Sequence, residues 1–170
     1  MAAAEQQKKR DVFKLSRDRL SVQEVVDAVS STSCGAISIF LGTTRDSFEG
    51  RHVIGLEYEA YDAMVQSELS KLSADIRARW PTVTHVCVHH RLGWVGVGEA
   101  SVAIAISSPH RHDAQQAVQF CIDGIKTHVP IWKKEVYAEG EAASWKENKE
   151  CAWGGAKKQG GGATEDGGQA

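Results

Sequence analysis

The stretch SVAIAISSPHRHDAQQAVQFCIDGIKTHVPIWKKEVY, residues 101–137, decides the class of fold, because it predicts a strand, a helix and a strand in succession. Val102, Ile104 and Ile106 alternate with smaller residues, which is typical of a β-strand. Helical spacing follows in Ala114, Ala117, Val118, Cys121, Ile122, Ile125 and Val129. Pro130 ends the helix, and residues 131–137 return as a strand.

The start of this helix brings two cationic side chains together. Ser108 is a favourable N-cap, and Pro109 suits the first helical position. We therefore expect His110 and Arg111 in the first turn, where free backbone N–H groups and the helix dipole already favour an anion. A cation in that turn opposes the dipole, which counts against a purely structural role.

The preceding segment repeats the order of strand, helix and strand. Residues 36–41 and 54–60 are strand-like and flank the polar loop 42–50, so we expect a hairpin with an elaborated tip. The next helix has a regular apolar stripe and ends before Pro81; the stripe consists of Val65, Leu69, Leu72, Ile76 and Trp80. Residues 83–92 form the following strand.

Two shorter segments complete the expected architecture. Ser21 and Glu24 form a capping box, which places the first helix of the chain at 22–29. Residues 93–98 contain three glycines and are expected to be a connection. A helix followed by two strand–helix–strand units predicts an α+β domain with a mixed sheet.

Composition bounds the function. The 170 residues are 42% hydrophobic and 25% charged with a net charge of −2, as expected for one soluble domain without a pull toward nucleic acid or anionic lipid. No apolar run reaches the ~20 residues of a membrane span, and no secretory signal is evident. We expect a flexible segment 1–10, a domain 11–150 and a flexible glycine-rich tail 151–170. The domain holds 15 basic and 19 acidic residues, so a basic site must be local.

The sequence lacks the residue patterns of a zinc site, a nucleophile elbow and a phosphate-binding loop. The four cysteines, Cys34, Cys87, Cys121 and Cys151, have no zinc-type spacing and suggest free thiols in the cytosol. His89 and His90 are adjacent on a strand and point to opposite faces, so they cannot share a metal ion. A nucleophile elbow and a phosphate-binding loop with its lysine are both missing.

The remaining signal is a set of cations at the ends of elements: Arg45, His110, Arg111, Lys126, Lys133 and Lys134. One interpretation is structural, with Lys126 capping its helix and the lysine pair on a solvated edge. The other is a site for a small phosphorylated molecule, in which arginine forks hold phosphate and a partly desolvated lysine acts as general acid or base. Spacing alone does not decide between them.

The sequence resembles the large, catalytic subunit of molybdopterin synthase. The resemblance covers residues 12–150, in family order, and rests on the blocks GTTRD (42–46), LEYEAY (56–61), VGEASV (97–102), SPHR (108–111) and VPIWKKE (129–135). It implies an α/β hammerhead fold with a small additional antiparallel β subdomain. It also implies a dimer of large subunits, each binding a small ubiquitin-like sulfur-carrier subunit, which makes a heterotetramer.

The implied reaction passes sulfur from the carrier's C-terminal Gly-Gly thiocarboxylate to cyclic pyranopterin monophosphate. Two rounds form the dithiolene of molybdopterin and open the cyclic phosphate, without a metal or further cofactor. The family's substrate-contacting positions fall on Thr43, Thr44, Arg45, His110, Arg111, Lys126, Lys133, Lys134 and Glu135. We assign catalysis to Lys126 and Lys133, phosphate binding to the arginines and His110, and positioning to Lys134 and Glu135.

Two other functions are weighed against this one. A non-catalytic scaffold for the carrier or another partner would not need every expected cation, yet all are present. A phosphoester hydrolase would need a nucleophile or a metal constellation. Gly167 and Gly168 do not make this chain the carrier itself, because Gln169 and Ala170 follow them.

Overall fold

The computed structural model describes residues 8–138 and 145–146. Three parts of the chain lie outside the described residues: positions 1–7 of the expected flexible segment 1–10, the polar stretch 139–150 apart from 145–146, and the expected flexible tail 151–170, which includes Cys151. In the described part, no helix is long and apolar enough to cross a membrane.

A four-stranded mixed sheet forms the centre of the molecule, with the strand order β1-β5-β7-β2. β1 (Arg10–Ser16) runs parallel to β5 (His85–Arg91), whereas β7 (Ala100–Ser108) is antiparallel to both β5 and β2 (Ala36–Thr43). Nearly every residue of β5 and β7 is buried, because helices cover both faces of these central strands. The expected mixed sheet is confirmed.

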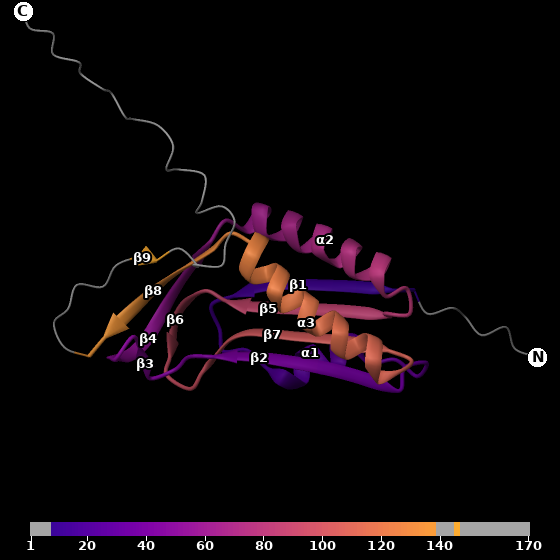
Figure 1. Cartoon of the computed structure of the whole chain (residues 1–170), viewed down its shortest axis with the longest axis horizontal. Helices are drawn as coiled ribbons and strands as arrows, with labels where there is room; N and C mark the ends of the chain where they lie inside the picture. The colour runs from indigo at the N-terminus through magenta and orange to yellow at the C-terminus, as the bar shows by residue number, and fades with distance from the viewer. Residues whose placement is uncertain (1–7, 139–144, 147–170) are drawn as a thin grey trace, which may run out of the picture.

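Three helices sandwich this sheet (Figure 1). α2 (Asp62–Arg79) and α3 (Arg111–His128) cover one face, where Ile76, Ile104 and Ile106 belong to the larger core. α1 (Val22–Val29) covers the other face and buries Val25 and Val29 in a smaller core. The predicted apolar stripes of α2 and α3 are confirmed, since nearly all their members are buried.

A smaller antiparallel sheet adjoins one end of this sandwich. It contains β3 (Ser47–Phe48), β4 (Arg51–Ala60), β8 (Ile131–Tyr137) and β9 (Trp145–Lys146), and β6 (Gly93–Gly96) pairs with β4. An α+β fold with an additional antiparallel subdomain is therefore confirmed.

Two connections differ from the prediction. β2 and β4 do not form one hairpin: β2 pairs with β7 in the large sheet, and β4 pairs with β8 and β6 in the small one. The expected connection 93–98 contains strand β6, which local glycine content conceals. It packs there because Gly55 has no side chain; a Cβ on Gly55 would lie 2.3 Å from the Trp94 ring.

The helix starts are partly as predicted. Ser21 caps α1 and accepts a hydrogen bond from the Glu24 amide at 3.2 Å, which confirms half of the capping box. The prediction that Ser108 caps α3 is wrong, because β7 continues through Ser108, and His110 occupies the N-cap. The prediction that a helix comes first is also wrong, since β1 precedes α1.

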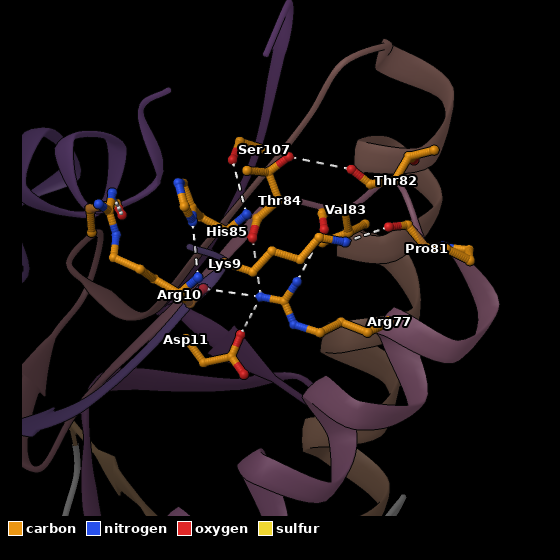
Figure 2. A network of polar contacts seen from close by, with 11 residues as sticks. Lys9, Arg10, Asp11, Arg77, Pro81, Thr82, Val83, Thr84, His85 and Ser107 are labelled. Carbon is orange, nitrogen blue, oxygen red and sulfur yellow. Dashed lines mark hydrogen bonds and ion pairs between the residues drawn. The ribbon is translucent and has the colours of Figure 1, made fainter. Parts of the chain in front are cut away.

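Besides its parallel pairing with β5, β1 is linked to the sandwich by the guanidinium group of one arginine (Figure 2). Arg77, near the end of α2, donates to Asp11 Oδ1 at 2.7 Å, to the Arg10 carbonyl at 3.1 Å and to the Thr84 carbonyl at 3.2 Å. Its other terminal nitrogen donates to the Val83 carbonyl at 3.0 Å. A single side chain thus joins β1, α2 and the start of β5.

Candidate active site

A cavity of about 450 Å³ lies where the small sheet meets the end of α3. The carboxyl end of β2 and the loop after it form one side, through Thr43 and Arg45. The last turn of α3 contributes Lys126, and β8 contributes Lys133 and Glu135. Five of the nine predicted site residues therefore surround one cavity, although they come from three separate parts of the chain.

The pairing of β4 with β8 determines which side chains face this cavity. Tyr58 stands opposite Lys133, and Leu56 stands opposite Glu135. Directly opposed residues of an antiparallel pair project to the same side, and all four line the cavity. Alternation along β8 then turns Lys134 to the reverse side of the sheet, opposite Glu57.

The inner wall of the cavity contains three polar side chains that sequence reasoning missed: Tyr58, His90 and Ser101. The Tyr58 hydroxyl bonds to Ser101, and the His90 ring packs edge-on against Tyr58 at 5.0 Å between centroids. Burial lowers the pKa of His90 to about 4, so its ring is neutral at physiological pH. Burial also raises the pKa of Tyr58, against the opposing effect of its bond to Ser101, and the nearby charge of Glu135 adds to the rise.

The only sequence signal for this wall was weak. Tyr58 occupies the apolar face of an alternating strand, where a hydroxyl requires a partner when buried. Neither His90 nor Ser101 stands out, because tertiary packing alone brings β5 and β7 beside β4. The remainder of the lining is largely apolar, with Phe40, Ile122 and Ile125 among its members.

Three predicted site residues lie away from this cavity within the chain. His110 and Arg111 begin α3, and Lys126 lies in its last turn. A rise of 1.5 Å per residue separates Arg111 from Lys126 by roughly 22 Å. Lys134 is the third, on the reverse side of the small sheet.

Thr44 adjoins the cavity without lining it. It is 4% exposed, and its backbone bonds to Glu99 and Gly98 at 3.1 and 2.9 Å. Its hydroxyl has no hydrogen-bond partner among the residues that the structure describes. The Thr44 backbone therefore fixes the start of the loop that presents Arg45.

The two adjacent histidines of β5 have different surroundings, and the described cysteines form no disulfide. His89 and His90 point to opposite faces: the charges of Glu24 and Lys14 act on His89, whereas His90 lines the cavity. Across residues 8–138 and 145–146, no three metal-ligating side chains converge. Cys34, Cys87 and Cys121 are free, and burial raises the pKa of Cys87 and of Cys121 to about 12.

The fold and the site together define a class of protein: an α+β protein with a half-apolar cavity, bordered by one arginine and two lysines, that suits a small anionic ligand. A model of the MoaE protein family matches residues 15–128. The chain belongs to the MoaE family.

Individual relatives agree with this assignment. Molybdopterin synthase catalytic subunit 2 of Aedes aegypti is 57% identical over 142 residues, which span 83% of this chain and 92% of the relative. The human molybdopterin synthase catalytic subunit is 53% identical over 148 residues, covering 87% and 77%. The crystal structure of molybdopterin synthase from Staphylococcus aureus superimposes with a TM-score of 0.74 at 33% identity, covering 79% and 96%. The family contains catalytic subunits of a sulfur-transferring enzyme in molybdenum cofactor biosynthesis.

Proposed function

We propose that the cavity binds cyclic pyranopterin monophosphate and receives the C-terminal thiocarboxylate of a small ubiquitin-like carrier subunit. Sulfur then passes to the pterin side chain in two rounds, each of which returns the carrier terminus to a carboxylate. Lys126 and Lys133 hold the thiocarboxylate anion and move protons as carbon–oxygen bonds give way to carbon–sulfur bonds. No metal or further cofactor takes part.

The observation that carries this proposal is the convergence of Arg45, Lys126 and Lys133 on one cavity in a member of the MoaE family. The domain as a whole is acidic, so a random surface site would not gather three cations. The apolar lining near Phe40 and Ile122 suits a flat ring system, whereas the cations suit phosphate and thiocarboxylate.

His110 and Arg111 join the site in our proposal through a second copy of the chain. β2 and α3 run in the same direction, since Gly35 bonds to Pro109 at their beginnings and Gly42 and Lys126 share the cavity at their ends. β2 spans about 23 Å and the distance from Arg111 to Lys126 is about 22 Å, so the two elements match in length.

The free edge of β2 is where we place the two-fold axis. In the described part of the chain, β2 pairs only with β7, and Ile37, Ile39 and Leu41 are about two-fifths exposed. Antiparallel pairing of β2 with its symmetry mate would exchange the two ends of the strand. His110 and Arg111 of each copy would then border the cavity of the other. Adding one carrier to each chain gives a heterotetramer.

We also place the protein in the cytosol, where reducing conditions suit the free and buried thiols of Cys87 and Cys121. The competing function is a non-catalytic scaffold that docks the carrier or another partner. A scaffold would need a docking surface but would have no use for a half-buried lysine beside a buried carboxylate in a cavity, as found at Lys133 and Glu135.

The deciding experiment mixes the purified protein with thiocarboxylated carrier and cyclic pyranopterin monophosphate, and measures the dithiolene product. We expect product to form without added metal or nucleotide, and about two carriers to be consumed for each product, since each sulfur atom comes from one thiocarboxylate. Binding of the carrier without product would favour the scaffold.

A further inference from the structure

A buried carboxylate lies beside the cavity lysine on β8. Glu135 is 3% exposed and lines the cavity, and the Tyr137 hydroxyl donates a hydrogen bond to its Oε2 atom. A carboxylate removed from water is costly unless hydrogen bonds or cations compensate for the lost solvation. The hydrogen-bond and ion-pair partners of Glu135 therefore determine the position of its carboxylate.

Tyr137 is itself fixed from the far side. The Arg51 guanidinium lies over the Tyr137 ring, 3.5 Å from its centroid, in a cation–π contact. Tyr137 is 8% exposed, so its ring has little room to turn. The hydroxyl consequently meets Glu135 from one direction.

Lys133, Glu135 and Tyr137 form a row on one face of β8, because alternate residues of a strand share a face. Neighbours in this row are about 7 Å apart along the backbone, within the reach of a lysine side chain. The carboxylate has two oxygens, and the bond from Tyr137 uses Oε2. Glu135 can therefore hold the tyrosine hydroxyl with one oxygen and the Lys133 ammonium with the other.

We propose that Tyr137 is a positioning residue of the sulfur-transfer site: it fixes the Glu135 carboxylate, and this carboxylate fixes the Lys133 ammonium in the cavity. The inference rests on the proposed role of Lys133. It extends the site to a side chain that does not reach the cavity, and it explains why a buried acid stands beside a catalytic lysine.

The kinetic test is Tyr137→Phe, which removes one hydroxyl and keeps the ring under Arg51. We expect kcat to fall roughly tenfold, as for loss of a hydrogen bond to a charged group, with the pterin KM changed less than about twofold. Adding Tyr137→Phe to Glu135→Gln should cause little further loss, since both changes break the same connection. Tyr61→Phe is the matched control, because Tyr61 is 68% exposed at the start of α2.

A second measurement does not depend on turnover. Acylation of Lys133 by a small amine-reactive reagent is followed by mass spectrometry, with Lys134 on the reverse side of the sheet as the internal reference. If Glu135 holds the ammonium, its release in Tyr137→Phe and in Glu135→Gln should raise the Lys133:Lys134 ratio about threefold or more, the order expected for loss of a weak ion pair.

The outcomes separate the two proposals. An unchanged labelling ratio in Tyr137→Phe overturns the positioning role of Tyr137, whether or not the wild type makes dithiolene. A raised ratio in a wild-type protein that makes no dithiolene supports the coupling of Tyr137, Glu135 and Lys133 but overturns the proposed function. Additive losses in the double variant also overturn the positioning role, because they would mean that Tyr137 and Glu135 act independently.

Discussion

Lys126 and Lys133 reach one cavity from different elements, the last turn of α3 and the centre of β8. Pro130 ends the helix between them, and β8 then turns away to pair with β4. Lys126 and Lys133 are only seven positions apart in the sequence, yet they line the same cavity from two different elements. Together with Arg45, these two lysines outnumber Glu135, the one carboxylate among the described residues that line the cavity, so the cavity favours an anionic ligand.

The two lysines give the first prediction. Lys126→Ala and Lys133→Ala should each lower dithiolene formation at least about a hundredfold, since in the proposed mechanism each charge acts on the reacting atoms. The free energy of unfolding should change by less than about 0.5 kcal/mol for Lys126→Ala, because Lys126 is an exposed residue at a helix end. Product assays and urea denaturation measure the two effects.

Lys134→Ala is the matched control for Lys133→Ala. Lys134 is the next residue, but it stands opposite Glu57 on the reverse side of the sheet. We expect its loss of activity to be at least about tenfold smaller than that of Lys133→Ala, as for a charge outside the cavity. Equal losses would contradict our assignment of the two faces.

The second prediction concerns the shared site. Lys126→Ala and Arg111→Ala dimers should each be nearly inactive, and a mixture refolded at equal amounts should recover about a quarter of the wild-type activity. In a two-fold dimer each hybrid has one intact site if Arg111 serves the partner, and hybrids are about half of the population. No recovery on mixing would mean that both residues serve the same chain.

Dimerisation itself has a direct test. Ile39→Lys places a charge in the centre of the exposed β2 row and should shift the protein to a monomer in light scattering, because a buried unpaired charge is costly. Lys71→Ala, on the exposed face of α2, should leave the mass unchanged. If Ile39→Lys remains a dimer, the β2 edge is not the dimer interface.

The third prediction tests the link between β1 and α2. Arg77→Ala removes four hydrogen bonds, three of them to backbone carbonyls, and should lower the free energy of unfolding by about 2–4 kcal/mol. Lys71→Ala on the same helix removes only the exposed pair with Glu68 and should cost less than about 0.5 kcal/mol. Similar costs for the two variants would show that Arg77 is dispensable for holding β1.

The fourth prediction is a pH dependence. The pKa of His90 is lowered by burial from 6.5 to about 4, so the unfolded chain binds this proton more readily than the folded one. The neutral His90 ring makes its full contribution to the free energy of unfolding above pH 6.5, and this contribution is lost as the pH falls toward 4. The expected loss is about 1.4 kcal/mol per pH unit and on the order of 3 kcal/mol in total. His90→Gln should flatten the slope of unfolding free energy between pH 7 and about 5.

A control histidine is available for that measurement. His52→Gln changes an exposed side chain and should keep the wild-type slope. Burial also lowers the pKa values of His85 and His89, so some slope should remain in His90→Gln. A wild-type slope in His90→Gln would contradict the burial argument.

Local pattern was sufficient for the main elements. Two periodic patterns predicted their elements correctly: the alternation in β7 and the stripe Val65-Leu69-Leu72-Ile76 in α2. A proline also marked the end of each of the two long helices. β1 was missed because charged residues interrupt its apolar positions, and its pairing with β5 is parallel and remote in sequence. β6 was missed for a different reason: two of its four residues are glycines, which are typical of a loop.

The sequence by itself determined the class of fold, the two long helices and the identity of the cations, because helix and strand periodicity and charge are local properties of the chain. Only the tertiary structure decided which of those cations meet. The length of α3 separates Arg111 from Lys126, strand alternation turns Lys134 away from Lys133, and the β4–β8 register brings Tyr58 and Glu135 into the cavity. Such distances depend on strand pairing between remote segments, which one-dimensional patterns do not encode.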